Sequence, residues 1–323
     1  MTTFFSEIRT QLKGTKKTIV LPEGNDVRIL HAASLLQNEG IVTPVLLGNV
    51  SEVEKTAEEA TIDVSGISII DPAEVSYFEE LVEVFVERRK GKATLEQARE
   101  LLQNVNYFGT MLVYTGRVDG LVSGAVHSTA DTVRPALQII RTKPGVSKTS
   151  GAFIMMKGNE KLVFADCAIT VAPTSKELAE IAIESSKTAQ AFGMHPRVAM
   201  LSFSTKGSAV TEETIKVAEA VKAAQLLAPE LLIDGEFQFD AAYVPEIAVK
   251  KAPDSTIQGD ANVFVFPSLE AGNIGYKLTE RLGGYEAIGP ILQGLNAPVN
   301  DLSRGCSADD VYKLSLITAA QSL

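Results

Sequence analysis

The residues best suited to bind a small molecule lie in short segments rich in glycine, serine and threonine. Three such segments are SGAVHSTADT at 123–132, SFSTKGS at 202–208 and EAGNIGYK at 270–277. Backbone amides and hydroxyl groups in loops of this kind bind anions, above all where a helix begins. We therefore expect an anionic ligand. Its candidate contacts in these loops are Ser128, Thr129, Thr132, Ser204, Lys206, Asn273 and Lys277.

Several better-known sites are missing from the sequence. It contains neither GxxxxGK[ST] nor GxGxxG, which disfavours a nucleoside triphosphatase and a simple Rossmann dehydrogenase. HExxH is absent as well, and the histidines are widely separated. The two cysteines, Cys167 and Cys306, are too few for a disulfide framework or a four-thiolate metal site. A zinc enzyme is therefore disfavoured.

The formal net charge of −10 limits the partners further. Such a surface repels nucleic acid and anionic membranes, so an anionic ligand needs a local basic pocket. Individual arginines are therefore more informative here than usual. No apolar run approaches the ~18 residues that cross a bilayer, and the N-terminal segment lacks a signal-peptide core. We expect a cytoplasmic protein with small-molecule partners, assembled as a homodimer.

Short β-rich runs alternate with helical patterns along the 323 residues. Thr18–Leu21, Gly120–Val122 and Arg197–Leu201 each end in Gly, Ser or Pro, and a helical pattern follows. This alternation is typical of α/β proteins with mainly parallel sheets, whose ligands bind beyond the carboxyl ends of the strands. Helices are expected at Phe78–Arg89, at Glu177–Phe192, and from a capping box at Ser307 and Asp310 to about Gln321.

The chain length predicts two domains. The segment TKPGVSKTSG at 142–151 and the Gly/Pro-rich stretch at 283–298 are the expected crossings between them. We therefore expect one α/β domain from residues 1–145 and 298–323, and a second from residues 146–297.

Longer segments resemble a known family. They include DGLVSGAVHSTADTVRPALQII (119–140), FPSLEAGNIGYK (266–277) and GPILQGLNAPVNDLSRGCSADD (289–310), and the resemblance covers nearly the whole chain. The chain is similar to phosphate acetyltransferases. That resemblance implies reversible transfer of an acetyl group between acetyl phosphate and coenzyme A, without a metal cofactor. It also implies a two-domain, three-layer fold like that of isocitrate and isopropylmalate dehydrogenases, with the active site in the interdomain cleft.

The resemblance also assigns functional residues. The family's LSRG–Asp segment matches Ser303, Arg304 and Asp310, and the arginine of STADTVRP matches Arg134. A further family arginine falls in VERRKGK, where Arg88 is our preferred match and Arg89 is the adjacent alternative.

These residue types suit the chemistry. An arginine fork binds two phosphate oxygens at once, which suits Arg134 and Arg304. Ser303 can donate to the oxyanion of a tetrahedral intermediate, or it can simply bond its own loop backbone. Asp310 is the candidate base for the thiol of coenzyme A, and its alternative role is that of a helix cap. An ordinary carboxylate faces about 6 kcal/mol uphill when it takes a thiol proton, so a base here needs help from burial or from an arginine.

Three alternatives remain open. Phosphate butyryltransferase differs only in the volume of the acyl pocket, where one methylene is worth about 1–3 kcal/mol. A metal-dependent dehydrogenase of related architecture needs a carboxylate cluster that the sequence does not show. A covalent acyl-enzyme on Cys167 is disfavoured, because this cysteine lies in the apolar run FADCAI and a buried thiol is inert. We expect coenzyme A thiolate to attack acetyl phosphate directly in a ternary complex.

Overall fold

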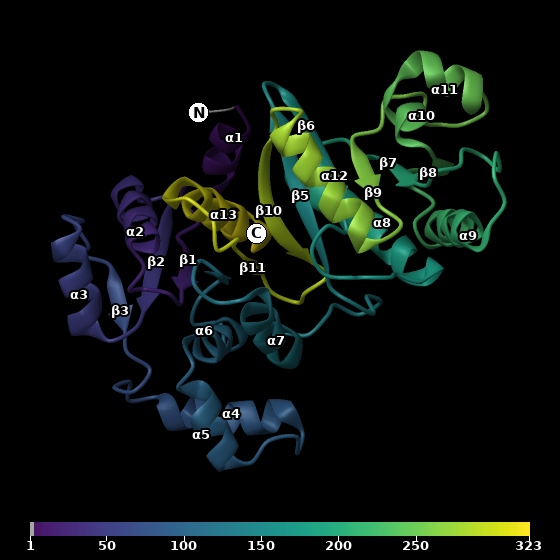
Figure 1. Cartoon of the computed structure of the whole chain (residues 1–323). Coiled ribbons are helices and arrows are strands. Elements are labelled where there is room, and N and C mark those ends of the chain that lie inside the picture. Colours follow the sequence, from purple (N-terminus) through teal and green to yellow (C-terminus); the bar gives the residue numbers. More distant parts are fainter. Residues whose placement is uncertain (1–2) are drawn as a thin grey trace. The chain divides into compact units, whose positions relative to one another are not determined.

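The computed structural model describes residues 3–323, so the first two residues of the expected first domain lie outside it. The chain divides into two compact units (Figure 1). Unit 1 comprises Thr3–Lys143 and Leu295–Leu323, and unit 2 comprises Pro144–Gly294. The last residue of the first expected segment, 145, lies two positions beyond Lys143, and the expected return at 298 lies three positions beyond Leu295.

Unit 1 is built on a five-stranded sheet in the order β11-β4-β1-β2-β3. All of its pairs are parallel. The central strands are short apolar runs whose side chains are buried, as expected for a parallel sheet covered on both faces. The strands are β1 (Lys17–Leu21), β2 (Val42–Leu47), β3 (Ser68–Ile70), β4 (Gly120–Ser123) and β11 (Val299–Asp301).

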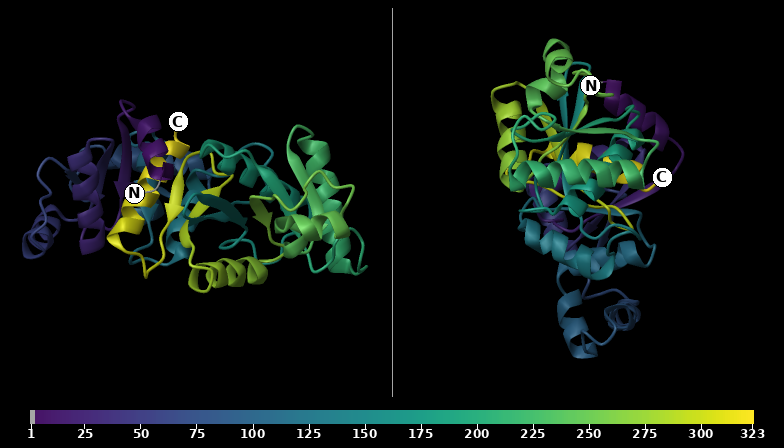
Figure 2. Two further views of the ribbon diagram at one scale, coloured as in Figure 1. Left: turned by 90° about the horizontal axis from the view of Figure 1, so that it is seen from above. Right: turned by 90° about the vertical axis from the view of Figure 1, so that its right-hand side faces the viewer.

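Helices cover the sheet of unit 1. They are α1 (Thr3–Leu12), α2 (Val27–Glu39), α3 (Val50–Glu59), α4 (Phe78–Arg89), α5 (Leu95–Leu102), α6 (Val105–Tyr114), α7 (Thr129–Ile139) and α13 (Ala308–Gln321). Helix α13 packs on α2, and α6 packs on α7. The pair α4 and α5 stands off from the sheet on the far side of α6 (Figures 1 and 2). The predicted helix at 78–89 and the predicted C-terminal helix are both confirmed.

Unit 2 has a six-stranded sheet in the order β10-β5-β6-β9-β7-β8. Strands β10, β5 and β6 pair antiparallel, whereas β6, β9, β7 and β8 pair parallel. The strands are β5 (Ser150–Lys157), β6 (Glu160–Ala165), β7 (Arg197–Leu201), β8 (Leu232–Phe237), β9 (Val263–Val265) and β10 (Glu286–Gln293). The helices are α8 (Ser175–Ala191), α9 (Glu212–Leu227), α10 (Phe239–Tyr243), α11 (Pro245–Lys251) and α12 (Leu269–Arg281). The predicted α/β class with mainly parallel sheets is confirmed.

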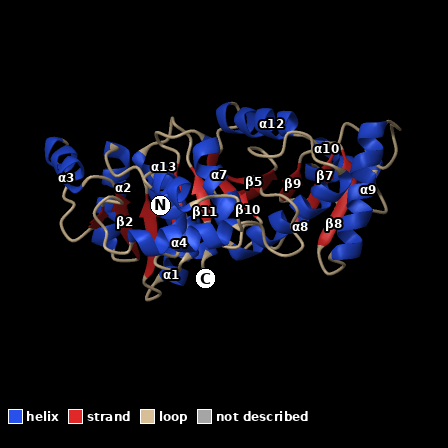
Figure 3. Cartoon of the chain, turned by 90° about the horizontal axis from the view of Figure 1, so that it is seen from below, coloured by secondary structure: helices blue, strands red, loops and turns tan. Residues whose placement is uncertain are grey.

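One glycine-rich segment is not the loop that the sequence suggested. Residues 270–277 lie inside α12, on the outside of the unit 2 sheet (Figure 3). The glycines serve close packing, because a Cβ on Gly272 would lie 2.2 Å from the carbonyl oxygen of Asp166, and one on Gly275 would lie 2.9 Å from the ring of Phe266. The prediction that this segment is an anion-binding loop is therefore wrong.

The described residues, 3–323, contain no helix that is both long and apolar enough to cross a membrane.

Candidate active site

The candidate site lies where three neighbouring strands of unit 1 end. Strands β11, β4 and β1 are adjacent and parallel, so their carboxyl ends meet at one edge of the sheet. The segments that leave this edge are residues 22–28, 124–128 and 302–307. This is the edge at which open α/β sheets bind ligands.

Arg28 connects all three segments. Its guanidinium grips the carboxylate of Asp26 with two hydrogen bonds, of 2.9 Å from Nε and 2.8 Å from Nη2. Nη2 also donates to the carbonyl oxygen of Ala125 at 2.8 Å. Nη1 donates to the carbonyl oxygens of Arg304, at 2.8 Å, and of Cys306, at 3.1 Å. One side chain therefore fixes the spacing of the three segments.

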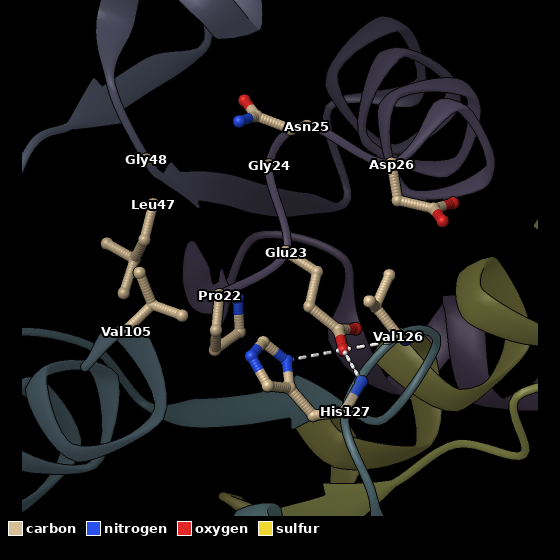
Figure 4. Close-up of a pocket in the computed structure, with 10 residues that line it drawn as sticks. All are labelled: Pro22, Glu23, Gly24, Asn25, Asp26, Leu47, Gly48, Val105, Val126 and His127. Atoms are coloured by element: carbon tan, nitrogen blue, oxygen red, sulfur yellow. Dashed lines mark hydrogen bonds and ion pairs between the residues drawn. The ribbon is translucent and has the colours of Figure 1, made fainter.

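The carboxylate of Glu23 accepts hydrogen bonds from the backbone amides that follow β4 (Figure 4). It accepts hydrogen bonds from the N–H groups of Gly124 at 3.1 Å and of Ala125, Val126 and His127 at 2.8 Å. Nδ1 of His127 lies 2.8 Å from the same carboxylate. The sequence suggested that the amides of residues 124–127 bind an anionic ligand. In the structure they bind the carboxylate of Glu23 instead.

The Glu23–His127 pair is charged by its surroundings. Burial works against ionisation of Glu23, but the hydrogen bonds from His127 and from the backbone amides outweigh it, and the pKa of Glu23 is lowered. The hydrogen bond to Glu23 raises the pKa of His127 in turn, against a smaller opposing effect of burial. The pair favours a carboxylate bound to an imidazolium.

The predicted hydroxyl groups at the start of α7 have internal partners. Ser128 is the N-cap of α7, and its Oγ donates to Asp131 at 2.6 Å. Oγ1 of Thr129 donates to Oδ2 of Asp301 at 2.6 Å. Thr132 is buried on the next turn, where its hydroxyl faces Asp301 without closing an ordinary hydrogen bond. Ser128 and Thr129 are exposed, so both remain accessible to a ligand.

Asp301 is a buried carboxylate at the end of β11. Its residue is only 1% exposed, and Oδ1 has no hydrogen-bond partner within residues 3–323. Burial raises the pKa of Asp301 to about 6, the hydrogen bonding of Thr129 and Thr132 opposes that rise, and the negative charge of Glu23 adds to it.

The arginines divide into two groups. The sequence contains eleven, all within the described residues. Most are bound to carboxylates or to backbone carbonyl oxygens: Arg9, Arg28, Arg88, Arg99, Arg117, Arg141, Arg197 and Arg281. In residues 3–323 no hydrogen bond or ion pair engages the guanidinium of the other three, which are Arg89, Arg134 and Arg304. All three belong to unit 1.

Arg88 has partners within the protein, whereas no hydrogen bond or ion pair engages the guanidinium of Arg89 within the described residues. Nε of Arg88 donates to the carbonyl oxygen of Ile139 at 2.6 Å, and Nη2 donates to that of Ile140 at 3.1 Å. Its guanidinium also lies over the ring of Tyr114, 4.8 Å from the centroid. These contacts bind the end of α7 to α4. Arg88 therefore has a structural role, and substrate binding by Arg88 or by Arg89 stays a prediction.

Arg89 and Arg134 act on the same phenol. Burial raises the pKa of Tyr107, and the positive charges of Arg134 and Arg89 both oppose that rise. The charges of two arginines, one on α4 and one on α7, thus act on one residue of α6. Such a pair can bind a dianionic phosphate group.

Ser303 and Arg304 lie in the exposed turn between β11 and α13. Oγ of Ser303 accepts a hydrogen bond of 3.3 Å from the N–H of Gly305, which leaves its own proton available to a ligand. The backbone of Arg304 is held by Arg28, while its side chain is exposed. The turn therefore presents a fixed backbone with free functional groups.

Asp310 does form the predicted capping box. Its Oδ2 accepts hydrogen bonds of 2.8 Å from both the N–H and the Oγ of Ser307, and its own N–H donates to Oγ of Ser307 at 3.2 Å. All of these side-chain contacts involve Oδ2. The other oxygen, Oδ1, is left for a second partner, so capping and proton transfer do not compete for the same atom.

Neither cysteine resembles a nucleophile. Cys167 is fully buried, and burial raises its pKa well above the ordinary value. Cys306 is also buried, and burial raises its pKa to about 11, although the charge of Arg28 opposes that rise. Both thiols are therefore protonated at neutral pH.

The four candidates in unit 2 are engaged within that unit. Oγ of Ser204 donates to the buried Glu236 at 2.9 Å, and Nζ of Lys206 binds Asp234 at 2.5 Å. On α12, the amide of Asn273 donates to the carbonyl oxygen of Cys167 at 3.1 Å. Lys277 in turn donates to Asn273 at 2.9 Å. Each of these contacts has a structural purpose, and substrate binding by these residues stays a prediction.

A pocket of about 300 Å³ opens beside the Glu23–His127 pair (Figure 4). Its walls are mainly apolar, and its two carboxylates are neutralised by His127 and by Arg28. It can therefore take an apolar part of an anionic ligand. The lining residues are Pro22, Glu23, Gly24, Asn25, Asp26, Leu47, Gly48, Val105, Val126 and His127.

Three residues of the site, Glu23, Arg28 and Asp301, belong to no short motif in the sequence. Glu23 lies in the PEG segment directly after the first predicted strand, and Asp301 directly after the last strand of the same sheet. Their position at strand ends was the available signal, because charged residues there face the ligand edge of a parallel sheet. Which backbone groups they bind depends on the strand order, which one sequence does not reveal.

The fold and this site define a class: an α/β protein with a candidate site for an anionic small molecule beyond the carboxyl edge of a parallel sheet. The model of the family described as "Phosphate acetyl/butaryl transferase" matches residues 3–319. A phosphate acetyltransferase of Bacillus subtilis (strain 168) is 64% identical over 323 residues, which is 100% of both chains. The chain belongs to the phosphate acetyl/butaryl transferase family.

Solved structures agree with this assignment. The EutD phosphotransacetylase from Staphylococcus aureus superposes with a TM-score of 0.95 at 63% identity, covering 99% of this chain and 98% of that one. A structure described as a proposed 4-hydroxythreonine-4-phosphate dehydrogenase from Salmonella typhimurium has a TM-score of 0.55 at 11% identity over 95% of this chain and 100% of that one. The latter likeness concerns the fold alone, and it supports the expected dehydrogenase-like architecture.

Proposed function

We propose that this protein transfers an acetyl group reversibly between acetyl phosphate and coenzyme A. The observation that carries the proposal is a set of three arginines, Arg89, Arg134 and Arg304, whose guanidinium groups have no hydrogen bond or ion pair within residues 3–323, in a chain of net charge −10. Leaving a guanidinium without a carboxylate in so acidic a chain makes sense where an anionic ligand binds. Both substrates of this reaction carry phosphate groups, and the names of the relatives support the same reaction.

The unpaired arginines and the Ser303 turn have separate roles in this proposal. Arg134 and Arg89 hold the phosphate group of acetyl phosphate, each through a planar fork. Ser303 and Arg304 stabilise the negative charge that develops on the acyl oxygen and on the leaving phosphate. Arginines thereby supply the charge stabilisation that the departing phosphate needs, so the reaction requires no metal or bound cofactor, and coenzyme A is a substrate.

Asp310 accepts the thiol proton through Oδ1 while Oδ2 keeps the helix capped. The nearby positive charge of Arg304 stabilises the nascent thiolate, which reduces the uphill step that an ordinary carboxylate faces. The thiolate then attacks the acyl carbon, the bond from carbon to phosphate oxygen breaks, and inorganic phosphate leaves. The high pKa of Cys167 and its burial support direct transfer without an acyl-enzyme.

The apolar pocket beside Glu23 supports a role in binding coenzyme A. The carboxylates of Glu23 and Asp26 are paired with His127 and Arg28, so the pocket does not repel an anionic substrate. Only an apolar part of coenzyme A would enter it. A bulky replacement of Val126, which is exposed at its mouth, is expected to raise the KM for coenzyme A and leave the KM for acetyl phosphate unchanged.

One assay tests the proposed reaction. The purified protein is supplied with coenzyme A and, in parallel, with acetyl, propionyl or butyryl phosphate, and thioester formation is followed for each. We expect acetyl phosphate to give the highest kcat/KM. A preference for butyryl phosphate would instead assign phosphate butyryltransferase, and the absence of thioester with all three would overturn the proposal.

We also propose a cytoplasmic homodimer. Helix α12 supports the dimer, because Ile274, Leu278 and Leu282 are exposed at spacings of four residues and form one apolar stripe. Leu278→Glu is expected to give a monomer by light scattering. Leu226→Glu is the control, since that leucine is 83% exposed at the end of α9, away from the stripe. A dimeric Leu278→Glu protein would exclude this surface.

A further inference from the structure

Asp301 has features that the proposed reaction does not explain. It is a buried carboxylate, and within residues 3–323 neither its Oδ1 nor the buried hydroxyl of Ser123 has a hydrogen-bond partner. Ser123 is the register partner of Asp301 on β4, so both side chains lie on the same face of the sheet. A buried polar group without a partner costs stability, and groups of this kind are retained where they have a function.

The backbone is shaped to admit this carboxylate. A Cβ on Gly124 would lie 2.5 Å from Oδ1 of Asp301, and Gly124 adopts a φ of +114°. Any other residue there would displace the carboxylate and strain the chain. The space beside β4 is therefore reserved for Asp301.

One contact links the buried carboxylate to the surface. Oγ1 of Thr129 donates to Oδ2 of Asp301 at 2.6 Å, and Thr129 is an exposed residue at the first position of α7. A hydroxyl has one proton. While the Thr129 O–H donates its hydrogen bond to Asp301, Oγ1 of Thr129 can only accept further hydrogen bonds. It therefore cannot donate one to an oxyanion.

We propose that Asp301 is a positioning residue that controls the direction of the Thr129 hydroxyl and couples oxyanion binding to the uptake of one proton. When phosphate or acetyl phosphate binds at the start of α7, Asp301 takes a proton from solvent and donates it in a hydrogen bond to Oγ1 of Thr129. The Thr129 O–H then turns to donate to the oxyanion. No covalent bond other than the new O–H bond of Asp301 changes. The inference rests on the proposed function, which brings a phosphate group to this site.

Among the charged groups around Asp301, the carboxylate of Glu23 favours its protonation. Glu23, in the segment after β1, raises the pKa of Asp301, and His127, from the β4–α7 segment, is held by Glu23. On α7, Asp131 is exposed and bound to Ser128, and Arg134 is also exposed. An arriving phosphate adds negative charge and favours protonation further. Since the pKa of Asp301 is already about 6, proton uptake near neutral pH costs little.

Calorimetry tests the coupling directly. Inorganic phosphate is titrated into the protein at pH 7 in two buffers of different ionisation enthalpy, and the difference in heat gives the protons taken up per phosphate bound. Phosphate itself exchanges protons near neutral pH, so the difference between two proteins tests the coupling. We expect the unchanged protein to take up clearly more protons per phosphate bound than Asp301→Asn does. Asp309→Asn, an exposed neighbour of the capping box, is the control and should behave like the unchanged protein.

Kinetics provide a second test. The KM for phosphate in the reverse reaction should rise between pH 6 and pH 8, by at most about tenfold per pH unit for a single proton. Asp301→Asn should flatten this rise, and Thr129→Val should both flatten it and raise the KM. Thr129→Ser, which keeps the hydroxyl, should restore the slope.

The outcomes separate this inference from the proposed function. If the protein forms no thioester from coenzyme A, the proposed function fails. If it is active and its proton uptake on binding phosphate equals that of Asp301→Asn, only the role of Asp301 is overturned. An Asp301→Asn protein that retains the full slope of KM against pH would overturn it too. Should Asp301→Asn fail to fold, Thr129→Val, which removes the hydroxyl that donates to Asp301, replaces it in the calorimetry.

Discussion

The guanidinium of Arg28 holds the backbone of Arg304, with a hydrogen bond of 2.8 Å from Nη1 to the carbonyl oxygen. The two residues are 276 positions apart in the chain. Arg28 is itself fixed by its bidentate contact with Asp26, which lowers the pKa of that carboxyl and raises the pKa of the guanidinium. Arg28 itself has no proposed contact with the reacting atoms. It nevertheless sets the position of Arg304, which has one.

Arg28→Lys should lower activity, because it breaks the hydrogen bonds that hold the three segments together. An ammonium group cannot bind Asp26 in two places and also reach carbonyl oxygens of two other segments. We expect kcat/KM to fall by at least about tenfold, since small displacements of a catalytic group are costly, and the free energy of unfolding to fall by about 1–3 kcal/mol. Steady-state kinetics and denaturant unfolding measure both. In the control, Arg281→Lys, the side chain is 80% exposed and pairs, within residues 3–323, only with the adjacent Glu280, so neither quantity should change much.

Arg304→Lys tests the anchoring role itself. The substitution keeps the positive charge but loses the planar fork that binds two oxygens. We expect most of kcat to be lost while the free energy of unfolding stays nearly the same, because the side chain of Arg304 is exposed and only its backbone is held by Arg28. Arg281→Lys, at an 80% exposed side chain on α12, is the matched control. Turnover like that of the unchanged protein would rule out bidentate binding by Arg304.

The fold was largely predictable from local patterns. The helix at 78–89 and the capping box at Ser307 depend on residues three or four positions apart, and both are present in the structure. The 270–277 segment was mistaken for a loop because glycine suggests a turn when only its own neighbours are known. Its glycines instead permit close contact with Asp166 and Phe266, which are remote in the chain.

The candidate site was predictable where residues act through motifs, and not where they act across the sheet. Glu23 binds amides about a hundred positions away, and the Arg88 side chain binds carbonyl oxygens at the end of α7. Such contacts depend on strand order and helix packing. The same limitation explains why Arg88 was preferred over Arg89, since adjacent residues on a helix differ only in the direction they face.

The cysteines should be slow to react. Because burial raises the pKa of Cys306 to about 11, only a minute thiolate fraction exists at pH 7. We expect alkylation of Cys306 by iodoacetamide to be far slower than that of a free thiol and to accelerate about tenfold per pH unit up to pH 9.

Cys167→Ala should retain substantial activity, and acetyl phosphate alone should leave no acetyl group on the protein by mass spectrometry. A stoichiometric adduct that coenzyme A discharges would instead establish an acyl-enzyme.

Stability should depend on pH through His127. Its pKa is raised in the folded state by Glu23, so the folded protein binds the proton more tightly than the unfolded chain does. The resulting stabilisation is complete below about pH 6.5, the ordinary histidine value, and is lost as the pH rises through the folded pKa. The difference in unfolding free energy between the unchanged protein and His127→Gln should therefore shrink from pH 6 to pH 9. A difference that grows over this range would contradict the ion pair.

Asp310→Asn separates catalysis from capping. The amide oxygen of asparagine can still accept the hydrogen bonds from Ser307 that Oδ2 now accepts, so the cap should lose only about 1 kcal/mol or less. A general base typically supplies about 10²–10⁴-fold in rate. We expect Asp310→Asn to fold, to bind coenzyme A, and to lose at least about a hundredfold in kcat.

The residual rate of Asp310→Asn should then report what the carboxylate did. With no base on the protein, the thiolate must come from ionisation of coenzyme A itself, so the residual kcat should rise with pH toward the thiol pKa of about 8.5. Asp309→Asn is the control on the same helical turn, where the side chain pairs with Lys313 and takes no part in the box. A protein with lowered thermal stability and nearly unchanged kcat would assign Asp310 to the cap alone. The positive charge of Arg304 would then have to generate the thiolate unaided.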